Sequence, residues 1–282
     1  MAPHGDKSDA AEETMVAEAE KRPISTILIV MAMQSEALPV VNKLNLSEDL
    51  ESVFPKGVPW VRYRGFYKDL NINLVWPGKD SSLGVDCVGT VPASLVTYAS
   101  IQALQPDLII NAGTAGGLKA KGACIGDAYV ASDVAFCDRR IPIPEFLFAI
   151  FADNDQSFIK YAAAEVFDLY GLGLRQAFST PNLQKELNLK VGKLSTGDSL
   201  HMSTQDEASM VANDAVVKDM EAAAVAYVAD LLKVPSVFLK VVIDIKDGEE
   251  TTAEESLQSF AALERAVTQV IDFINGKCLS DL

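Results

Sequence analysis

Three carboxylates in this chain stand where a predicted strand and a predicted helix meet, which suits acid–base chemistry. The first, Glu221, follows the extended run 215–217 and opens a stretch of small residues that ends at Tyr227. A helix start has free N–H groups and a partial positive charge, so it stabilises an anion there. Taken alone, Glu221 is most simply an ordinary acidic residue of a first helical turn.

Two further acids lie at the ends of apolar runs. Glu36 follows the run 27–33, at the change from a predicted strand to a predicted helix. Asp244 lies near the carboxyl end of the mostly apolar run 235–243. Open α/β sheets bind ligands in the crevice beyond the carboxyl ends of their strands. If the strands are parallel, these two acids and Glu221 meet at one rim, although each alone could be a helix cap or a turn residue.

The hydrophobic pattern predicts alternating strands and helices from residue 24 onward. Alternation with short connections is typical of a largely parallel sheet covered on both faces. We therefore expect an α/β protein, a single-domain three-layer α/β/α fold with a twisted, mixed, largely parallel sheet. The expected strands are 25–32, 59–66, 71–76, 107–112, 127–135, 190–196, 214–219 and 235–244, and the expected helices are 35–45, 91–104, 181–188, 204–212, 221–233 and 253–275.

Composition excludes several classes of partner. The 282 residues are 49% hydrophobic and carry a net charge of −15, which argues against nucleic acid or an anionic membrane surface as the main partner. No apolar run approaches the ~18 residues of a membrane span, and the N-terminus has no signal-peptide core. Four cysteines without CxxC spacing and two histidines make a metal site a poor fit. We expect a reduced, cytoplasmic, metal-free protein.

Two segments depart from the regular alternation. Residues 1–23 are rich in Ala and Glu and poor in large apolar residues, so we expect a disordered acidic tail before a folded domain at 24–282. Residues 145–165 are aromatic-rich and follow two prolines at 142 and 144. This second segment could form a short helix or a helical hairpin lying over the domain.

Two glycine-containing motifs follow predicted strands. The first, Asn-Ala-Gly-Thr-Ala-Gly-Gly at 111–117, could bring backbone N–H groups close to an anion or a sugar, or it could be a tight turn. It is not GxGxxG, so it is a poor dinucleotide fingerprint. The second, Ser-Thr-Gly-Asp-Ser at 195–199, is a similar strand end, where we expect Asp198 to cap the following turn.

Together these motifs resemble those of the methylthioadenosine/S-adenosylhomocysteine nucleosidases, and most closely the plant members. The resemblance runs from about residue 24 to the C-terminus. It is carried by the segments 31–36, 88–94, 111–117, 138–144, 195–199 and 219–224. It implies a nucleoside phosphorylase-like fold, a homodimer, and an enzyme that needs no metal or cofactor. It further implies hydrolysis of the N-glycosidic bond of 5′-methylthioadenosine, and in some members of S-adenosylhomocysteine, to release adenine in methionine salvage.

The resemblance assigns the two catalytic roles to Asp244 and Glu36. Cleavage builds positive charge on the ribose and negative charge on the base, so Asp244 would protonate adenine at N7. Its pKa should be raised by apolar surroundings, with which Ile243 and Ile245 are consistent. Glu36 would hold and deprotonate the attacking water. Inverting glycosidases use the same logic, with carboxyls roughly 6.5–9.5 Å apart.

The resemblance also assigns the residues that hold the substrate. Glu221 would accept hydrogen bonds from the ribose hydroxyls, and Met220 would pack on the sugar. Thr114 would help to position the water and the sugar. Leu200 and the backbone of His201 would hold the adenine, with the side chain of His201 as a bystander.

Lys240 precedes Asp244 by four residues on the same predicted strand face. At ~3.3 Å per residue the two are about 13 Å apart, too far for direct contact. We therefore expect Lys240 to form a buried structural ion pair elsewhere.

Two features depart from the family pattern. The residue before the catalytic Asp is usually Ser or Thr, whereas this chain has Ile243, which removes a hydroxyl. We predict that this chain has lower turnover or weaker adenine binding than its Ile243→Thr variant. Steady-state kinetics of the two proteins side by side test this, and equal constants contradict it.

The second departure is the segment 145–165, whose deletion would restore the plant pattern. This segment is either a genuine insertion or an unspliced intron, and peptide mass spectrometry of native protein would decide between them.

Two alternative functions share this fold. A phosphate-dependent nucleoside phosphorylase needs a cationic phosphate site, but the Gly-Asp-Pro-x-Arg-type loop of such enzymes is absent and Met-Gln-Ser-Glu stands there instead. A non-catalytic plant storage protein would not need Glu36, Glu221 and Asp244. We therefore favour the hydrolase, acting on a small nucleoside.

Overall fold

The computed structural model describes residues 21–51, 53–140, 170–246 and 251–282. Residues 1–20 of the predicted tail and the whole of the predicted insertion at 145–165 lie outside the described residues. Residues 21–23 are described and lie against the domain, because Pro23 forms a β-bridge with Cys278. The backbone N–H of Ile24 donates to the carbonyl of Lys277 next to this bridge.

All the strands and helices expected from the hydrophobic pattern are present, with ends that differ by a few residues at most except in one strand. The strands are β1 (Thr26–Val30), β2 (Ser47–Glu48), β3 (Val61–Tyr67), β4 (Leu70–Trp76), β5 (Leu108–Gly117), β6 (Ala128–Phe136), β7 (Arg175–Gln176), β8 (Lys190–Thr196), β9 (Ala215–Asp219) and β10 (Ser236–Ile245). The helices are α2 (Gln34–Lys43), α3 (Thr90–Leu104), α7 (Pro181–Leu187), α8 (Thr204–Ala212), α9 (Ala222–Leu231) and α10 (Ala253–Ile274).

One mixed sheet connects these strands, in the order β10-β6-β8-β9-β5-β1-β4-β3-β2. Because β10 also pairs with β5, the strands β10, β6, β8, β9 and β5 close into a ring. The pairs β1–β4, β1–β5, β5–β10, β6–β8 and β8–β9 are parallel, whereas β5–β9 and β6–β10 are antiparallel. The predicted mixed, largely parallel sheet is confirmed.

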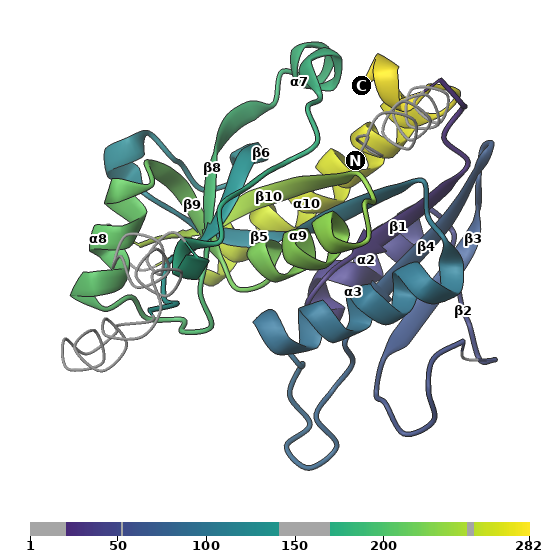
Figure 1. Cartoon of the computed structure of the whole chain (residues 1–282), viewed down its shortest axis with the longest axis horizontal. Helices are drawn as coiled ribbons and strands as arrows, with labels where there is room; N and C mark the ends of the chain where they lie inside the picture. The colour runs from purple at the N-terminus through teal and green to yellow at the C-terminus, as the bar shows by residue number, and fades with distance from the viewer. Residues whose placement is uncertain (1–20, 52, 141–169, 247–250) are drawn as a thin grey trace, which may run out of the picture.

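Helices cover both faces of the sheet, as predicted. Figure 1 shows α3 and α9 side by side on the near face, with α2 and α10 behind the sheet. The side chains of β1 divide between these layers: Leu28 and Val30 pack in the core under α3 and α9, and Ile27 and Ile29 in the core under α2 and α10. A strand buried on both faces reads as a continuous apolar run, which is why β1 was recognisable from sequence.

The strand that contains the start of the glycine motif at 111–117 was expected to end at residue 112. This prediction is wrong. Strand β5 continues through Gly117, because β10 pairs with its last residues on one side and β9 on the other. A Cβ at Gly116 would lie 2.8 Å from Oδ1 of Asp244 and closer still to Cε of Lys246. The small residues therefore admit neighbouring side chains rather than making a turn.

Candidate active site

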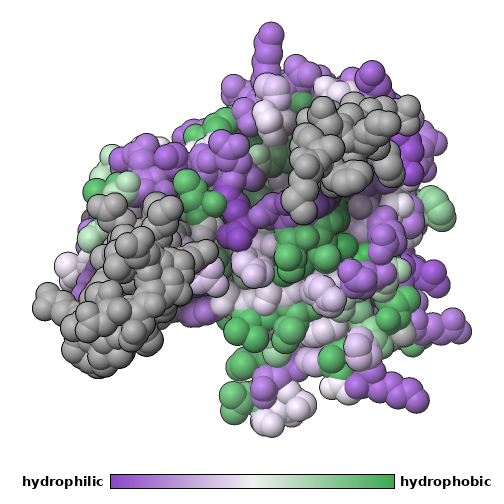
Figure 2. Space-filling model, viewed as in Figure 1, coloured by the Kyte–Doolittle hydropathy of each residue, from purple (hydrophilic) through white to green (hydrophobic). Residues whose placement is uncertain are grey.

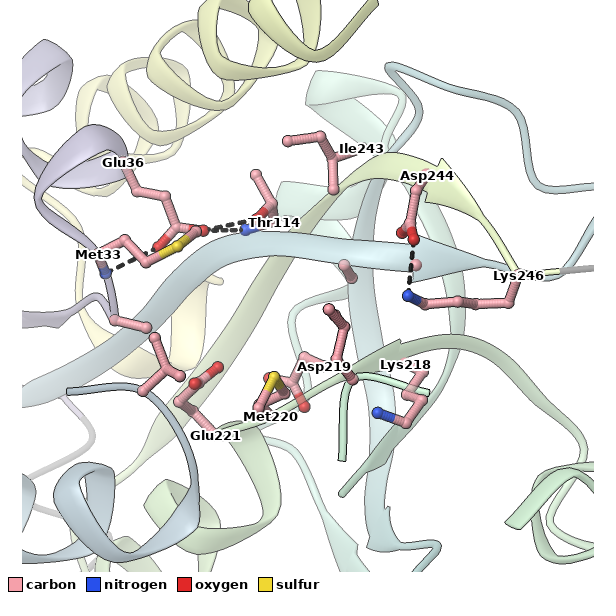
Figure 3. Close-up of a pocket in the computed structure, with 15 residues that line it drawn as sticks. Met33, Glu36, Thr114, Lys218, Asp219, Met220, Glu221, Ile243, Asp244 and Lys246 are labelled. Carbon is pink, nitrogen blue, oxygen red and sulfur yellow. Dashed lines mark hydrogen bonds and ion pairs between the residues drawn. The ribbon is translucent and has the colours of Figure 1, made fainter. Parts of the chain in front are cut away.

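A cavity of about 370 Å³ opens where β5, β9 and β10 meet the start of α2. Its volume falls within the range typical of small-molecule sites. Of the residues predicted from sequence, Glu36, Thr114, Leu200, Met220, Glu221 and Asp244 line it. Figure 3 shows Glu36 on the left of this cavity, next to Thr114, and Asp244 on the right, with Glu221 and Met220 below them.

The three acids meet for a reason other than the one expected. Strand β9 runs antiparallel to β5, so the assumption that all strands are parallel is wrong. Glu221 nevertheless reaches the cavity, because the pairing of β9 with β5 is limited to Gly116 and Gly117, at the carboxyl end of β5. The three acids therefore line one cavity because β9 and β5 pair over only these two residues.

Glu36 is a buried carboxylate held by three hydrogen bonds. Its Oε1 accepts from both the backbone N–H and the hydroxyl of Thr114, each at 2.7 Å. Its Oε2 accepts from the N–H of Met33, which precedes α2, at 3.2 Å. Only 2% of Glu36 is exposed, so these bonds replace water and fix the orientation of the carboxylate. Gly113 permits this approach, since a Cβ there would lie 3.2 Å from Oε1 of Glu36.

Glu221 lies at the N-cap position of α9, at the helix start where it was expected, and is buried, but its side chain makes no capping hydrogen bond. Its Oε1 accepts from the N–H of Gly89 at 2.9 Å. Burial, reinforced by the nearby charge of Asp219, raises the pKa of Glu221 to about 7. Lys240 opposes this rise. The carboxylate is thus poised to change charge close to neutral pH.

Asp219 also lines the cavity, although no role was predicted for it. Its Oδ1 accepts from the hydroxyl of Thr196 at 2.6 Å, and its Oδ2 accepts from the N–H of Ala222 at the start of α9 at 2.9 Å. Oδ2 also pairs with Nζ of Lys240 at 2.9 Å. The position of Asp219, three residues before a helix, is a capping signal that could have identified it.

Lys240 forms the buried ion pair expected of it. Burial lowers the pKa of Lys240, but attraction to Asp219 and to Glu221 outweighs burial, so that its pKa is raised. Glu36 adds to this attraction. One buried ammonium is therefore attracted by three acids at the cavity, and it stays charged.

Asp244 lies in surroundings that differ from the apolar ones predicted. Its side chain is 37% exposed, and its Oδ2 lies 2.6 Å from Nζ of Lys246. The prediction of an apolar environment around Asp244 is therefore wrong. Lys246 directly follows the last residue of β10, Ile245, and so lies two residues after Asp244.

A β-bulge at Ile243 turns Asp244 into the cavity. Val242 pairs with Ala115 and Asp244 with Gly116, so Ile243 is the extra residue on β10. Val242 and Ile245 both pack in the core under α3 and α9, although residues three apart would alternate on a regular strand. The strict alternation assumed between Lys240 and Asp244 therefore does not hold.

Leu200, Ile243 and Met220 supply apolar surface to the cavity. The side chain of His201 is exposed, and His201 is not among the described residues that line the cavity. Asp198, expected to cap the turn after it, instead accepts hydrogen bonds from the N–H and hydroxyl of Thr90 at the start of α3, both at 2.6 Å.

The raised pKa of Glu221 makes a prediction about stability. From about pH 4.5 to 7 the unfolded chain loses this proton while the folded chain keeps it, so the contribution of Glu221 to the free energy of unfolding falls as pH rises through that window. Glu221→Gln removes this penalty and keeps an oxygen for Gly89. We expect its Tm to exceed that of wild type at pH 8 but not at pH 5, measured by scanning calorimetry. An equal difference at both pH values would contradict a raised pKa.

The described part of the chain has neither a metal site nor a membrane-spanning helix. Among residues 21–51, 53–140, 170–246 and 251–282, no cluster of His, Cys, Asp and Glu has the arrangement of a metal site. Within the same part of the chain, no helix combines the length and the apolar character needed to cross a membrane.

Comparison with known proteins shows the family of this chain. Residues 26–274 match the phosphorylase superfamily. The chain is 62% identical to the 5′-methylthioadenosine nucleosidase of Arabidopsis thaliana over 288 aligned positions, which cover all of both proteins. It is 60% identical to the 5′-methylthioadenosine/S-adenosylhomocysteine nucleosidase of the same plant, over 96% of this chain and all of the relative.

A solved structure agrees with these similarities. The apo form of the Arabidopsis thaliana 5′-methylthioadenosine nucleosidase superposes with a TM-score of 0.81 and 63% identity, over 93% of this chain and all of that one. Similarity of this extent covers the fold and every segment that forms the cavity. The chain therefore belongs to the phosphorylase superfamily and, within it, to the family of the methylthioadenosine/S-adenosylhomocysteine nucleosidases.

Proposed function

We propose that this protein hydrolyses the N-glycosidic bond of 5′-methylthioadenosine to adenine and methylthioribose, a reaction that serves methionine salvage. S-adenosylhomocysteine is the second substrate to test, because one of the relatives carries it in its name. The observation that carries the proposal is one nucleoside-sized cavity with Glu36 on one side and Asp244 on the other.

Glu36 is suited to activate water on the sugar side. Breaking the bond leaves positive charge on the anomeric carbon, which a water molecule then attacks. Three donors from Thr114 and Met33 hold the Glu36 carboxylate, and its remaining lone pairs face the cavity. A carboxylate fixed in this way can accept the proton of the water without first reorienting.

Asp244 is suited to protonate the departing base. The electrons of the broken bond pass into the purine ring, and a proton at N7 neutralises them. The ammonium of Lys246 contacts Oδ2 of Asp244, which leaves Oδ1 to face N7 of the purine.

Glu221 and Met220 are suited to hold the sugar. Oε1 of Glu221 already accepts from Gly89, which leaves Oε2 for the ribose hydroxyls. The side chains of Met33, Met220 and Val88 give the cavity an apolar wall that fits a methylthio group better than a charged one.

A phosphorylase would need a free cation on the water side of the cavity. The lysines among the described lining residues are Lys218 and Lys246. The ammonium of Lys218 donates to the carbonyl of Ser199 at 2.7 Å, and that of Lys246 pairs with Asp244. Neither contacts Glu36, so we expect water rather than phosphate as the nucleophile.

The deciding experiment measures adenine release from 5′-methylthioadenosine in phosphate-free buffer and in added phosphate. We expect adenine and free methylthioribose at the same rate in both buffers. A rate that depends on phosphate, with a sugar phosphate as product, would identify a phosphorylase. Absence of adenine in both buffers would leave a non-catalytic protein of the same fold.

The surface supports a homodimer as part of the proposal. Figure 2 shows apolar side chains gathered over α3 and α9 on the near face. The exposed large apolar residues there include Val91, Leu95 and Tyr98 of α3 and Tyr227 and Leu231 of α9. An apolar patch of this kind marks an interaction site, and a second copy of the chain is the occupant that we propose. Sedimentation equilibrium measures the mass directly.

A cytoplasmic location of the protein also stays a proposal.

A further inference from the structure

Lys246 introduces an ammonium group beside the catalytic acid. Its Nζ lies 2.6 Å from Oδ2 of Asp244, and its side chain is 14% exposed, less than that of Asp244 itself. Gly116 lies under both side chains, and any larger residue there would displace them. The ammonium is therefore part of the cavity wall rather than a solvated surface group.

The other lysine of the wall cannot serve in the same way. Lys218 donates to two backbone carbonyls, those of Ser199 and Gly197, at 2.7 and 3.4 Å. Its charge is used to hold the segment after β8. Lys246 has a single carboxylate partner among the described residues, so its other protons are available to a ligand beside Asp244.

The hydrogen-bonding edge of the purine decides what such a site prefers. Adenine presents an acceptor at N7 and a donor at its 6-amino group, whereas a 6-oxopurine presents acceptors at both N7 and O6. A carboxylic acid alone matches adenine, since it can donate to N7 and accept from the amino group. An ammonium matches the two acceptors of the 6-oxopurine, a pairing that lysine makes with guanine in DNA.

We propose that the same site also cleaves 6-oxopurine nucleosides that carry a 5′-thioether, the class represented by 5′-methylthioinosine. This proposal rests on the proposed function, since it uses the same cavity and the same water. Lys246 donates to O6 and N7 of the base, and Asp244 orients the ammonium. Ile243, at the bulge, has no hydroxyl that could compete for either group.

The reaction balances without any further reactant. The bond between the anomeric carbon and N9 breaks, and its electron pair passes into the purine. The ammonium of Lys246 gives one proton to N7, so that neutral hypoxanthine leaves. The oxygen of water bonds to the anomeric carbon, and the water proton passes to Glu36. Exchange with solvent then returns the proton from Glu36 to Lys246.

The test compares two substrates on three proteins. Wild type, Lys246→Met and the control Lys233→Met are assayed for kcat/KM with 5′-methylthioadenosine and with 5′-methylthioinosine. Lys233 is a surface lysine with an 83% exposed side chain and does not line the cavity. Near-ultraviolet circular dichroism checks that each variant is folded.

We expect wild type and Lys233→Met to release both bases. Lys246→Met should lower kcat/KM for 5′-methylthioinosine by about 10- to 100-fold, the worth of a good bidentate base contact. The loss of kcat/KM for 5′-methylthioadenosine should be smaller, so that the ratio of the two constants falls by about 10-fold or more, because adenine presents a 6-amino donor where the 6-oxopurine presents the acceptor O6.

The outcomes separate this inference from the proposed function. Cleavage of 5′-methylthioadenosine without cleavage of 5′-methylthioinosine overturns the inference alone. An equal loss on both substrates in Lys246→Met also overturns it, since Lys246 would then only hold the site together. Failure of wild type to cleave either nucleoside overturns the proposed function itself.

Discussion

Replacing Glu36 with Gln is expected to lower kcat for 5′-methylthioadenosine by about 10²–10⁴-fold, the usual contribution of a general base. Gln keeps an oxygen that can accept from the N–H and hydroxyl of Thr114, but it cannot take a proton from water. KM should change far less than kcat, because the shape of the cavity is retained. Initial rates of adenine release measure both constants.

The fold of the Glu36→Gln variant should survive. The amide nitrogen would face the N–H of Met33, so one hydrogen bond at the start of α2 is lost. A lost bond of this kind costs about 0.5–1.5 kcal/mol, which leaves most domains folded. Glu186→Gln, an exposed change on α7, is the matched control and should behave as wild type. A kcat within tenfold of wild type would remove Glu36 from the role of base.

Asp244→Asn is expected to have an effect of similar size, because it removes the acid that protonates the departing adenine. Asn can still accept a hydrogen bond from the amino group of adenine and donate one to N7, but it has no proton to transfer. We expect kcat for 5′-methylthioadenosine to fall by about 10²–10⁴-fold. With 5′-methylthioinosine the loss should be smaller, because Lys246 remains to supply the proton.

Stability should not account for the loss in Asp244→Asn. The Asp244 side chain is 37% exposed, and Asn keeps an oxygen that can accept a hydrogen bond from the ammonium of Lys246, so only the charge of the ion pair is lost. Asp230→Asn, at an exposed acid that likewise pairs with a lysine, controls for that loss and should keep full activity. If Asp244→Asn and Asp230→Asn turn over 5′-methylthioadenosine equally fast, Asp244 is not the acid.

Local patterns in the sequence were sufficient to predict the elements of this fold, apart from the two-residue strands β2 and β7. Apolar runs such as that of β1 are buried on both faces, and amphipathic segments such as α10 cover them, so residue type and spacing report the structure directly. The acids at the strand and helix ends were recognisable for the same reason. Glu36 and Glu221 lie at helix starts, where backbone N–H groups are free to receive a carboxylate.

The contacts among these acids depended on strand pairing between distant parts of the chain. Whether β5 continues through its glycines is decided by β9 and β10, which lie about a hundred residues further on. The buried pair of Asp219 and Lys240 joins two different strands. No local spacing encodes either feature.

The sequence by itself determined the α/β class, the order of the elements and the acids that could do chemistry, because burial and capping act over a few neighbouring residues. Only the tertiary structure decided how those acids are surrounded. The bulge at Ile243 is a shift in the register between β10 and β5. It changes which side chains of β10 reach the cavity. Gly116 leaves room on β5 for both Asp244 and Lys246, so that the ammonium can lie against the carboxylate.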